Sequence, residues 1–135
     1  MSRARVDVTE PGRYRRPLAA MSRFLDGLDA AHPPVPAGAR VLAALGPKML
    51  DLAAARARGA HPYLVTPQHT RLSREALGDG ALVLPEQTVI LCGGRDEARV
   101  DEHRAAGTDH VALQALAPGQ GAFPRERWRR FTALL

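Results

Sequence analysis

The chain has 135 residues, a length typical of one domain, with 45% hydrophobic and 24% charged residues. This mixture is typical of a globular protein and argues against disorder along the whole chain. The net charge is +5, but the basic residues are 18 Arg and one Lys, Lys48, and isoleucine occurs once. A GC-rich coding sequence produces the same bias, so we do not expect nucleic acid as a partner.

A single cysteine, Cys92, excludes a disulfide within the chain and is typical of a reducing compartment. No apolar run approaches the ~20 residues that a membrane helix needs. The first residues are charged and lack the apolar stretch of a signal peptide. We therefore expect a cytoplasmic protein that does not bind membranes.

The N-terminal region is expected to hold a tail and one helix. Residues 1–16 are polar and rich in arginine, which predicts a flexible tail ahead of a single α/β domain over 17–135. Apolar residues recur at spacings of three and four over about 17–31, which predicts an amphipathic helix that begins at Pro17. The prolines after His32 end it, since proline lacks a backbone donor.

Short apolar runs then alternate with helical patterns, which predicts an α/β fold with a parallel sheet. We expect strands at Val41–Leu45, His61–Val65, Ala81–Leu84, Thr88–Leu91 and His110–Leu116, of which the third and fourth are one long strand or two. We expect helices from Pro47 to about Arg58, from Pro67 to the residue before Gly78, over Asp96–Ala106, and from Pro124 onward. Gly59 and Gly107 are expected to terminate the helices that precede them.

The strand-to-helix turn Ala43–Lys48 (A-A-L-G-P-K) is the best local candidate for a ligand site. Glycine permits close backbone approach, and the first turn of a helix offers unpaired N–H groups at its positive end. A phosphate or carboxylate could be held there, with Lys48 adding charge. The alternative is an ordinary turn in which Gly46 and Pro47 only cap the helix.

Histidines are the next candidates. His61 and His69 flank a strand-to-helix turn, and His110 begins a strand. Their spacing matches no metal motif and one cysteine cannot build a thiolate site, so no metal is expected. A histidine at a strand end can transfer protons or donate a hydrogen bond in a cofactor pocket. The alternative is a solvated or singly bonded side chain.

Four arginines surround Trp128 within 125–130, a composition that would suit a nucleic-acid surface. At helical spacing, however, Trp128, Phe131 and Leu135 share one face. We therefore expect an apolar stripe against the core, with the arginines in solvent.

Two linked segments carry a resemblance to a known family. From Arg40 to Ala54 (R-V-L-A-A-L-G-P-K-M-L-D-L-A-A) and from Gly59 to Thr70 (G-A-H-P-Y-L-V-T-P-Q-H-T), the sequence resembles luciferase-like monooxygenases. Within that family, it is most similar to the oxidoreductases that depend on the deazaflavin coenzyme F420. Leu84–Leu91 and Ala105–Leu116 resemble later barrel strands of the family, and the likeness covers most of 14–116 in order.

The resemblance implies a fold, a reaction and a cofactor. Family members are (β/α)8 barrels that bind a flavin or deazaflavin at the carboxyl ends of the strands. The reaction implied is hydride transfer or monooxygenation of a small organic substrate, with F420 as cofactor and FMN as the alternative. The cofactor-binding residues implied are Ala44, Leu45, Gly46, Pro47, Lys48, Met49 and His61, and no catalytic residue is assigned.

The same resemblance predicts an incomplete barrel. A (β/α)8 barrel needs about 250 residues, so these parallel β/α units would match the C-terminal half of a TIM barrel. The family's first strands have no counterpart before Tyr14, and its long insertion after Leu91 is missing. Open sheet edges would then be covered by a homodimer or by docking on another chain. The alternative to an enzyme is a non-catalytic half-barrel that acts as an interaction module or remnant.

Overall fold

The computed structural model describes residues 16–89, 95–115, 125, 128 and 129. The chain divides into two compact units, Met1–Pro36 and Ala37–Leu135, and each is described by itself. The predicted tail falls almost wholly outside the described residues, and so does most of the helix predicted from Pro124 onward.

The described part of the first unit holds one helix, α1 (Pro17–Asp29). It begins at the predicted proline and ends two residues before the predicted end. Because the residues that follow are rich in proline, the chain turns back, and the N–H of Val35 donates to the carbonyl of Leu28 at 3.0 Å. The predicted amphipathic helix is confirmed.

The second unit alternates short strands with helices. After a 3-10 turn (Ala37–Ala39) come β1 (Val41–Leu42), α2 (Pro47–Arg56), β2 (Gly59–Ala60), α3 (Pro67–Leu77), β3 (Leu82–Val83), β4 (Glu86–Val89), α4 (Arg95–Ala105) and β5 (Ala112–Ala115). All strand pairs are parallel, in the orders β1-β2-β3 and β4-β5. An isolated parallel bridge joins Tyr63, beyond β2, to Glu86 in β4. The predicted parallel α/β fold is confirmed, and the described strands form no closed barrel.

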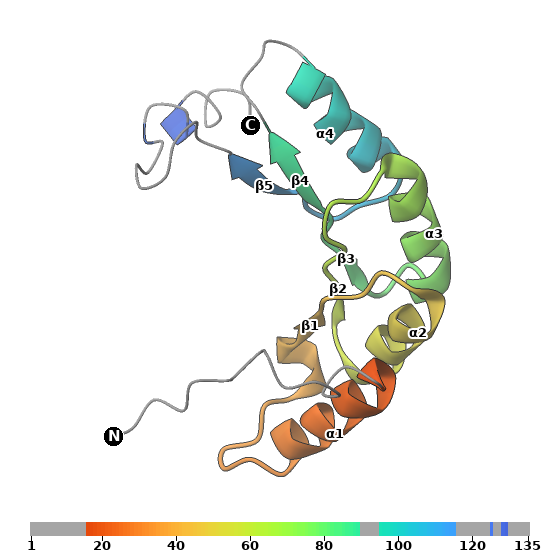
Figure 1. Ribbon diagram of the computed structural model, residues 1–135, viewed down its shortest axis with the longest axis vertical. Helices are drawn as coiled ribbons and strands as arrows, with labels where there is room; N and C mark the ends of the chain where they lie inside the picture. Colours follow the sequence, from red (N-terminus) through yellow and green to blue (C-terminus); the bar gives the residue numbers. More distant parts are fainter. Residues whose placement is uncertain (1–15, 90–94, 116–124, 126–127, 130–135) are drawn as a thin grey trace. The chain divides into compact units, whose positions relative to one another are not determined.

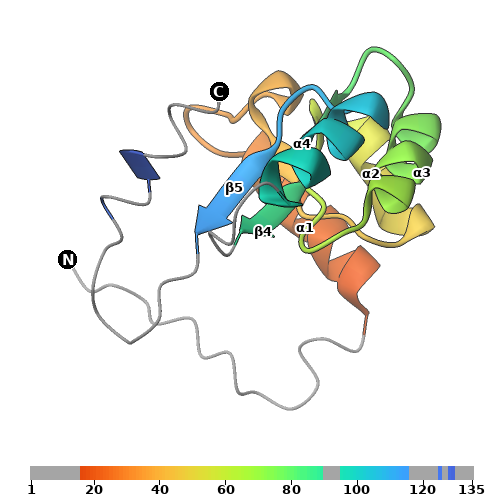
Figure 2. The same ribbon diagram turned by 90° about the horizontal axis from the view of Figure 1, so that it is seen from above.

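The helices of this unit lie along one face of the strands (Figures 1 and 2), where α2 packs on α3 and α3 on α4. Within each of the two sheets, the strands follow chain order without a reversal. A doubly wound sheet would show such a reversal, with helices on both faces. Small and branched residues between the strands and helices form the core, among them Leu42, Leu50, Ala53, Ala60 and Val83.

Gly59 corrects one prediction. It does not terminate α2, whose last turn closes when the N–H of Ala57 donates to Ala53. Gly59 lies in β2 instead, paired with Val41 on one side and Leu82 on the other. A Cβ atom there would lie 2.0 Å from the carbonyl oxygen of Leu82. The close approach of two backbones requires glycine here, whereas a helix end favours glycine for its positive φ.

The strand predicted at His61–Val65 is also corrected, because β2 begins two residues earlier and ends at Ala60. Pro62 interrupts the ladder, since it has no N–H to offer to β3. Of the two alternatives for Ala81–Leu84 and Thr88–Leu91, the structure has two strands, β3 and β4, with Pro85 between them, and β4 begins at Glu86 rather than at Thr88. Strand Val41–Leu45 shortens to β1, and the strand predicted at His110–Leu116 begins two residues later, as β5 (Ala112–Ala115).

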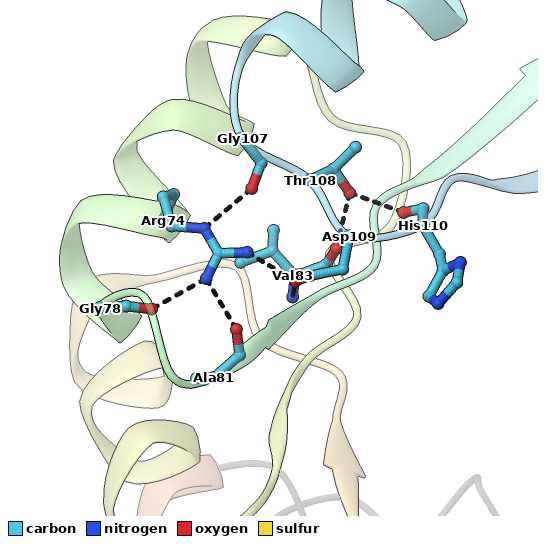
Figure 3. Close-up of polar contacts among 8 residues, drawn as sticks. All are labelled: Arg74, Gly78, Ala81, Val83, Gly107, Thr108, Asp109 and His110. Carbon is cyan, nitrogen blue, oxygen red and sulfur yellow. Dashed lines mark hydrogen bonds and ion pairs between the residues drawn. The ribbon is translucent and has the colours of Figure 1, made fainter.

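Arg74 in α3 joins the ends of three elements on the side of the strands opposite their carboxyl ends (Figure 3). Its guanidinium donates to the carbonyls of Gly78 at 2.8 Å, Ala81 at 2.7 Å and Gly107 at 2.8 Å, and to the carboxylate of Asp109 at 2.5 Å. The same Asp109 oxygen accepts from the N–H of Val83 at 2.8 Å. Burial alone would raise the pKa of Asp109, but the Val83 N–H and Arg74 together lower it below 3.8. This cluster ties α3 to β3 and to the loop before β5.

Candidate functional site

The predicted turn lies where β1 leads into α2, at the carboxyl ends of the strands. Ala44 is buried, Leu45, Gly46, Pro47 and Lys48 are exposed, and Met49 is half-buried. Gly46 precedes the first helical residue in an extended conformation, with φ −89° and ψ 157°, and no side chain caps the helix. The six turn residues predicted to bind cofactor are therefore contiguous, and four of them face solvent.

Two backbone N–H groups of this turn make no hydrogen bond to a described residue. The N–H groups of Met49 and Leu50 both donate to the Gly46 carbonyl at 3.0 Å, and Pro47 has no N–H. The N–H groups of Gly46 and Lys48 have no partner among the described residues. A Cβ atom built at Gly46 meets nothing within 4 Å. The turn thus presents two free donors, a positive helix end and an ammonium group to open space, which is the chemistry that holds an anion.

His61 lies between β1 and β3, and its main contacts are structural. Its N–H donates to Leu42 at 2.8 Å, and its ring Nδ1 lies 2.5 Å from the carbonyl oxygen of Leu84. Because a carbonyl only accepts, Nδ1 carries the proton. In a parallel ladder the amide of residue 62 would donate to this carbonyl, but that residue is Pro62, so the His61 ring replaces the missing bond. Nε2 remains as the free acceptor.

His69, in the first turn of α3, holds the predicted turn in place. Its Nε2 donates to the Leu45 carbonyl at 2.9 Å, while Ser73 contacts its Nδ1 at 3.2 Å. Its backbone N–H donates to Thr66, which caps α3. His110 is exposed and lies two residues before β5 rather than at its start.

A hollow that the sequence analysis did not anticipate lies beyond the end of β2. It has a volume of about 190 Å³ and is lined by Leu64, Val65, Thr66, Glu86, Gln87 and Arg99. These residues come from the loop between β2 and α3, from the start of β4 and from α4. They are up to 35 positions apart in the sequence (99 − 64), so no local motif could indicate the site. None of the predicted cofactor residues belongs to it.

A buried polar chain runs behind this hollow. The side-chain amide of Gln87 donates to the Thr88 carbonyl at 2.7 Å, which fixes its oxygen toward His103 Nε2 at 3.1 Å. His103 therefore carries its proton on Nε2, and Nδ1 accepts from the Thr70 hydroxyl at 2.8 Å. His103 has no exposed surface. Burial, with a contribution from Arg99, lowers its pKa below 6.5, against an opposing effect of Glu102.

Within the described ranges, no cluster of three or more His, Cys, Asp or Glu side chains could hold a metal ion. None of the helices in that part of the chain is long and apolar enough to cross a membrane. No family model matches the chain, and comparisons with curated proteins and with solved structures likewise give no match.

Proposed function

We propose that this chain is an incomplete (β/α) barrel of the luciferase-like oxidoreductase class, and that its β1–α2 turn binds the phosphate of a redox cofactor. F420 is the cofactor proposed, with FMN as the alternative. The reaction is hydride transfer to, or monooxygenation of, a small organic substrate. The observation that carries the proposal is the open turn, whose Gly46 and Lys48 N–H groups have no partner among the described residues.

The strand order supports this proposal. Parallel strands that follow chain order, with helices on one face, are the arrangement found within a (β/α)8 barrel. In such barrels ligands bind at the carboxyl ends of the strands, where the turn lies. The likeness in sequence falls on the same turn and on the segment that follows it, Gly59–Thr70.

Each proposed cofactor residue has a defined part. Gly46 and Lys48 donate their backbone N–H groups to the anion and Lys48 adds a positive charge, while Leu45 and Pro47 lie beside them, and Ala44 and Met49 anchor the turn from its buried side. His61 lies at the same ends of the strands and keeps Nε2 available. A bound flavin or deazaflavin would supply the hydride chemistry, while these residues bind its charged tail.

A substitution at Gly46 tests the proposal without disturbing the fold. Gly46→Asp places a carboxylate where the structure has open space, and this carboxylate caps α2 in place of the anion. We expect the variant to gain about 0.3–0.5 kcal/mol of stability and to lose cofactor affinity at least tenfold. Gly80→Asp is the matched control, because Gly80 is also exposed and open but lies between α3 and β3.

Fluorescence titrations with F420 and with FMN measure the effect. The proposal expects saturable binding by the wild type and by Gly80→Asp, and little by Gly46→Asp. Equal affinity in all three proteins, or no binding of either cofactor to the wild type near millimolar concentration, contradicts it.

The second candidate function is a non-catalytic interaction module. It is favoured by one observation: among the described strands, β1, β3, β4 and β5 each pair with a single neighbour, and only β2 pairs with two. Large apolar side chains also face solvent, including Val41, Tyr63 and Leu64. Light scattering across a concentration series tests it, since a monomer at every concentration argues against self-association as the way these edges are covered.

We also propose that the substrate is a small molecule, that nucleic acid is not a partner of this chain, and that the protein is located in the cytoplasm. The single cysteine, which is typical of a reducing compartment, supports that location. A heparin column checks the nucleic-acid statement, since salt-sensitive retention would contradict it.

A further inference from the structure

We propose that the face of β4 and β5 opposite α4 binds a small organic ammonium ion, whose charge is held by the carboxylate of Glu86. The site is a group of four hydrogen-bonded side chains, which we call the strand-face cluster: Tyr63, Glu86, Thr88 and Gln114. None of them belongs to the β1–α2 turn, so this proposal does not rest on the proposed function.

Side chains along β4 alternate between its two faces. Gln87 points toward α4, since its side-chain oxygen accepts from His103 Nε2 at 3.1 Å. Glu86 and Thr88, on either side of it in the sequence, therefore point to the opposite face. Gln114 in β5 pairs with Thr88, and its Oε1 lies 3.4 Å from the Thr88 hydroxyl. The side chains of β4 and β5 thus meet on the face that α4 leaves free.

Tyr63 reaches this face from the other side of β4. Its backbone forms a bridge with Glu86, whereas Gln114 lies in β5, along the opposite edge of β4. The Tyr63 hydroxyl donates to Gln114 Oε1 at 3.4 Å, so this pair of side chains crosses over β4 between Glu86 and Thr88. The crossing contributes to the low exposure of Glu86, 6%, while Tyr63 itself stays 47% exposed.

Glu86 is a negative charge without a counter-charge among the described residues. One carboxylate oxygen accepts from the Thr88 hydroxyl at 3.1 Å, and the other accepts no hydrogen bond from a described residue. The ion pairs within the described ranges do not include Glu86. Every fully buried side-chain oxygen in those ranges has a hydrogen bond, so the second oxygen is still reachable from solvent. A poorly hydrated carboxylate with one reachable oxygen favours a cationic donor.

An ammonium group matches the acceptors of the strand-face cluster. It carries one positive charge and donates up to three hydrogen bonds. The cluster offers the free Glu86 oxygen, the Thr88 oxygen, and Gln114 Oε1, whose donors in the described part are hydroxyls at 3.4 Å. The exposed ring of Tyr63 adds a π face, which attracts a cation. Because the cluster itself contains no basic side chain, we do not expect it to hold an anion.

Titration of the ¹⁵N-labelled protein with n-butylammonium, followed by NMR, tests the proposal. We expect saturable binding with a Kd of roughly 1–10 mM for so small a ligand. 1-Butanol has the same length without the charge, and butyrate has the opposite charge, so each should bind at least tenfold more weakly. Since the net charge of the chain is +5, nonspecific attraction would favour butyrate instead.

Two side-chain amides report which face is occupied. The NH₂ group of Gln114 lies in the cluster, whereas that of Gln87 donates to the Thr88 carbonyl at 2.7 Å, on a side chain that points toward α4. We expect n-butylammonium to shift the Gln114 signals and to leave the Gln87 side-chain signals in place. Shifts of the Gln87 signals as large as those of Gln114 would overturn the assignment of the face.

Two glutamates provide a matched pair of variants. Glu86→Gln and Glu75→Gln each remove one negative charge, but Glu75 is exposed on α3 and lies outside the cluster. Glu86→Gln should weaken n-butylammonium binding at least tenfold, and Glu75→Gln should leave it unchanged. Equal affinity in both variants, or no shifts in the wild type at ten times the expected Kd, overturns the proposal. If Glu86→Gln does not fold, the wild type decides, because equal binding of 1-butanol and n-butylammonium overturns the role of the carboxylate.

Discussion

Replacement of Gly59 by alanine should unfold the centre of the three-stranded sheet. The added Cβ would lie 2.0 Å from the Leu82 carbonyl oxygen and 2.6 Å from the Leu82 nitrogen, both backbone atoms that cannot rotate away. Ordinary carbon–oxygen contacts are about 3.3–3.6 Å, so β2 and β3 must separate by more than 1 Å. That separation breaks the bonds that the N–H groups of Leu82 and Leu84 donate to the carbonyls of Arg58, just before β2, and of Ala60, at 2.8 and 3.0 Å.

Two lost ladder bonds and the strain of overpacking together cost about 3–4 kcal/mol. Urea unfolding followed by far-UV circular dichroism measures this, because a change in stability alone shifts the midpoint and leaves the slope unchanged. Gly38→Ala is the control, since a Cβ there meets nothing within 4 Å. A loss below about 1 kcal/mol for Gly59→Ala would refute the assigned pairing of β2 with β3.

Three further predictions concern individual side chains. Arg74→Met should lower the free energy of unfolding by about 2–3 kcal/mol, because three carbonyls and Asp109 lose their donor. Arg71→Met, on the exposed side of α3, is the control and should lower it by less than about 0.5 kcal/mol in the same urea assay. His61→Ala should cost about 1–2 kcal/mol because the Leu84 carbonyl loses the donor that replaces the missing proline N–H; an unchanged midpoint would show that water satisfies it equally well. Burial lowers the pKa of His103 below its unfolded value of 6.5, so the unfolded state binds more protons, and stability should fall as the pH drops below 6.5, by at most about 1.4 kcal/mol per pH unit. Urea midpoints between pH 7.5 and 5 measure this, and a flat profile contradicts a buried neutral His103; the lowered pKa of Asp109 affects stability below about pH 5, outside that window.

Helix boundaries were predictable because local chemistry fixes them. Pro17 and Pro67 begin helices, and Gly78 and Gly107 end them with φ +76° and +89°. The exposed turn before α2 was also predictable, since glycine followed by proline marks a helix start wherever it occurs.

Strand positions were less predictable, because the strands are only two to four residues long. Gly59 illustrates the reason, since glycine marks both a helix end and a close approach of backbones, and only the partner Leu82 distinguishes them. His61 bonds to a carbonyl 23 positions away, and this contact depends on where Pro62 falls in the ladder.

Neither the hollow nor the contacts of Arg74 could be predicted from the sequence. Arg74 contacts Asp109, 35 positions away, and the hollow is lined by residues from a loop, from β4 and from α4 that adjoin only in the folded chain. Nothing in the sequence distinguishes these charges from residues on a solvated surface.

The most direct test of the account is an NMR titration with F420 that maps which amides respond. We expect the amide chemical shifts of Gly46 and Lys48 to change most, and to saturate at the same cofactor concentration as the fluorescence signal. Binding that leaves these two amides unchanged, or that shifts a different surface, would contradict the assignment of the β1–α2 turn as the anion site.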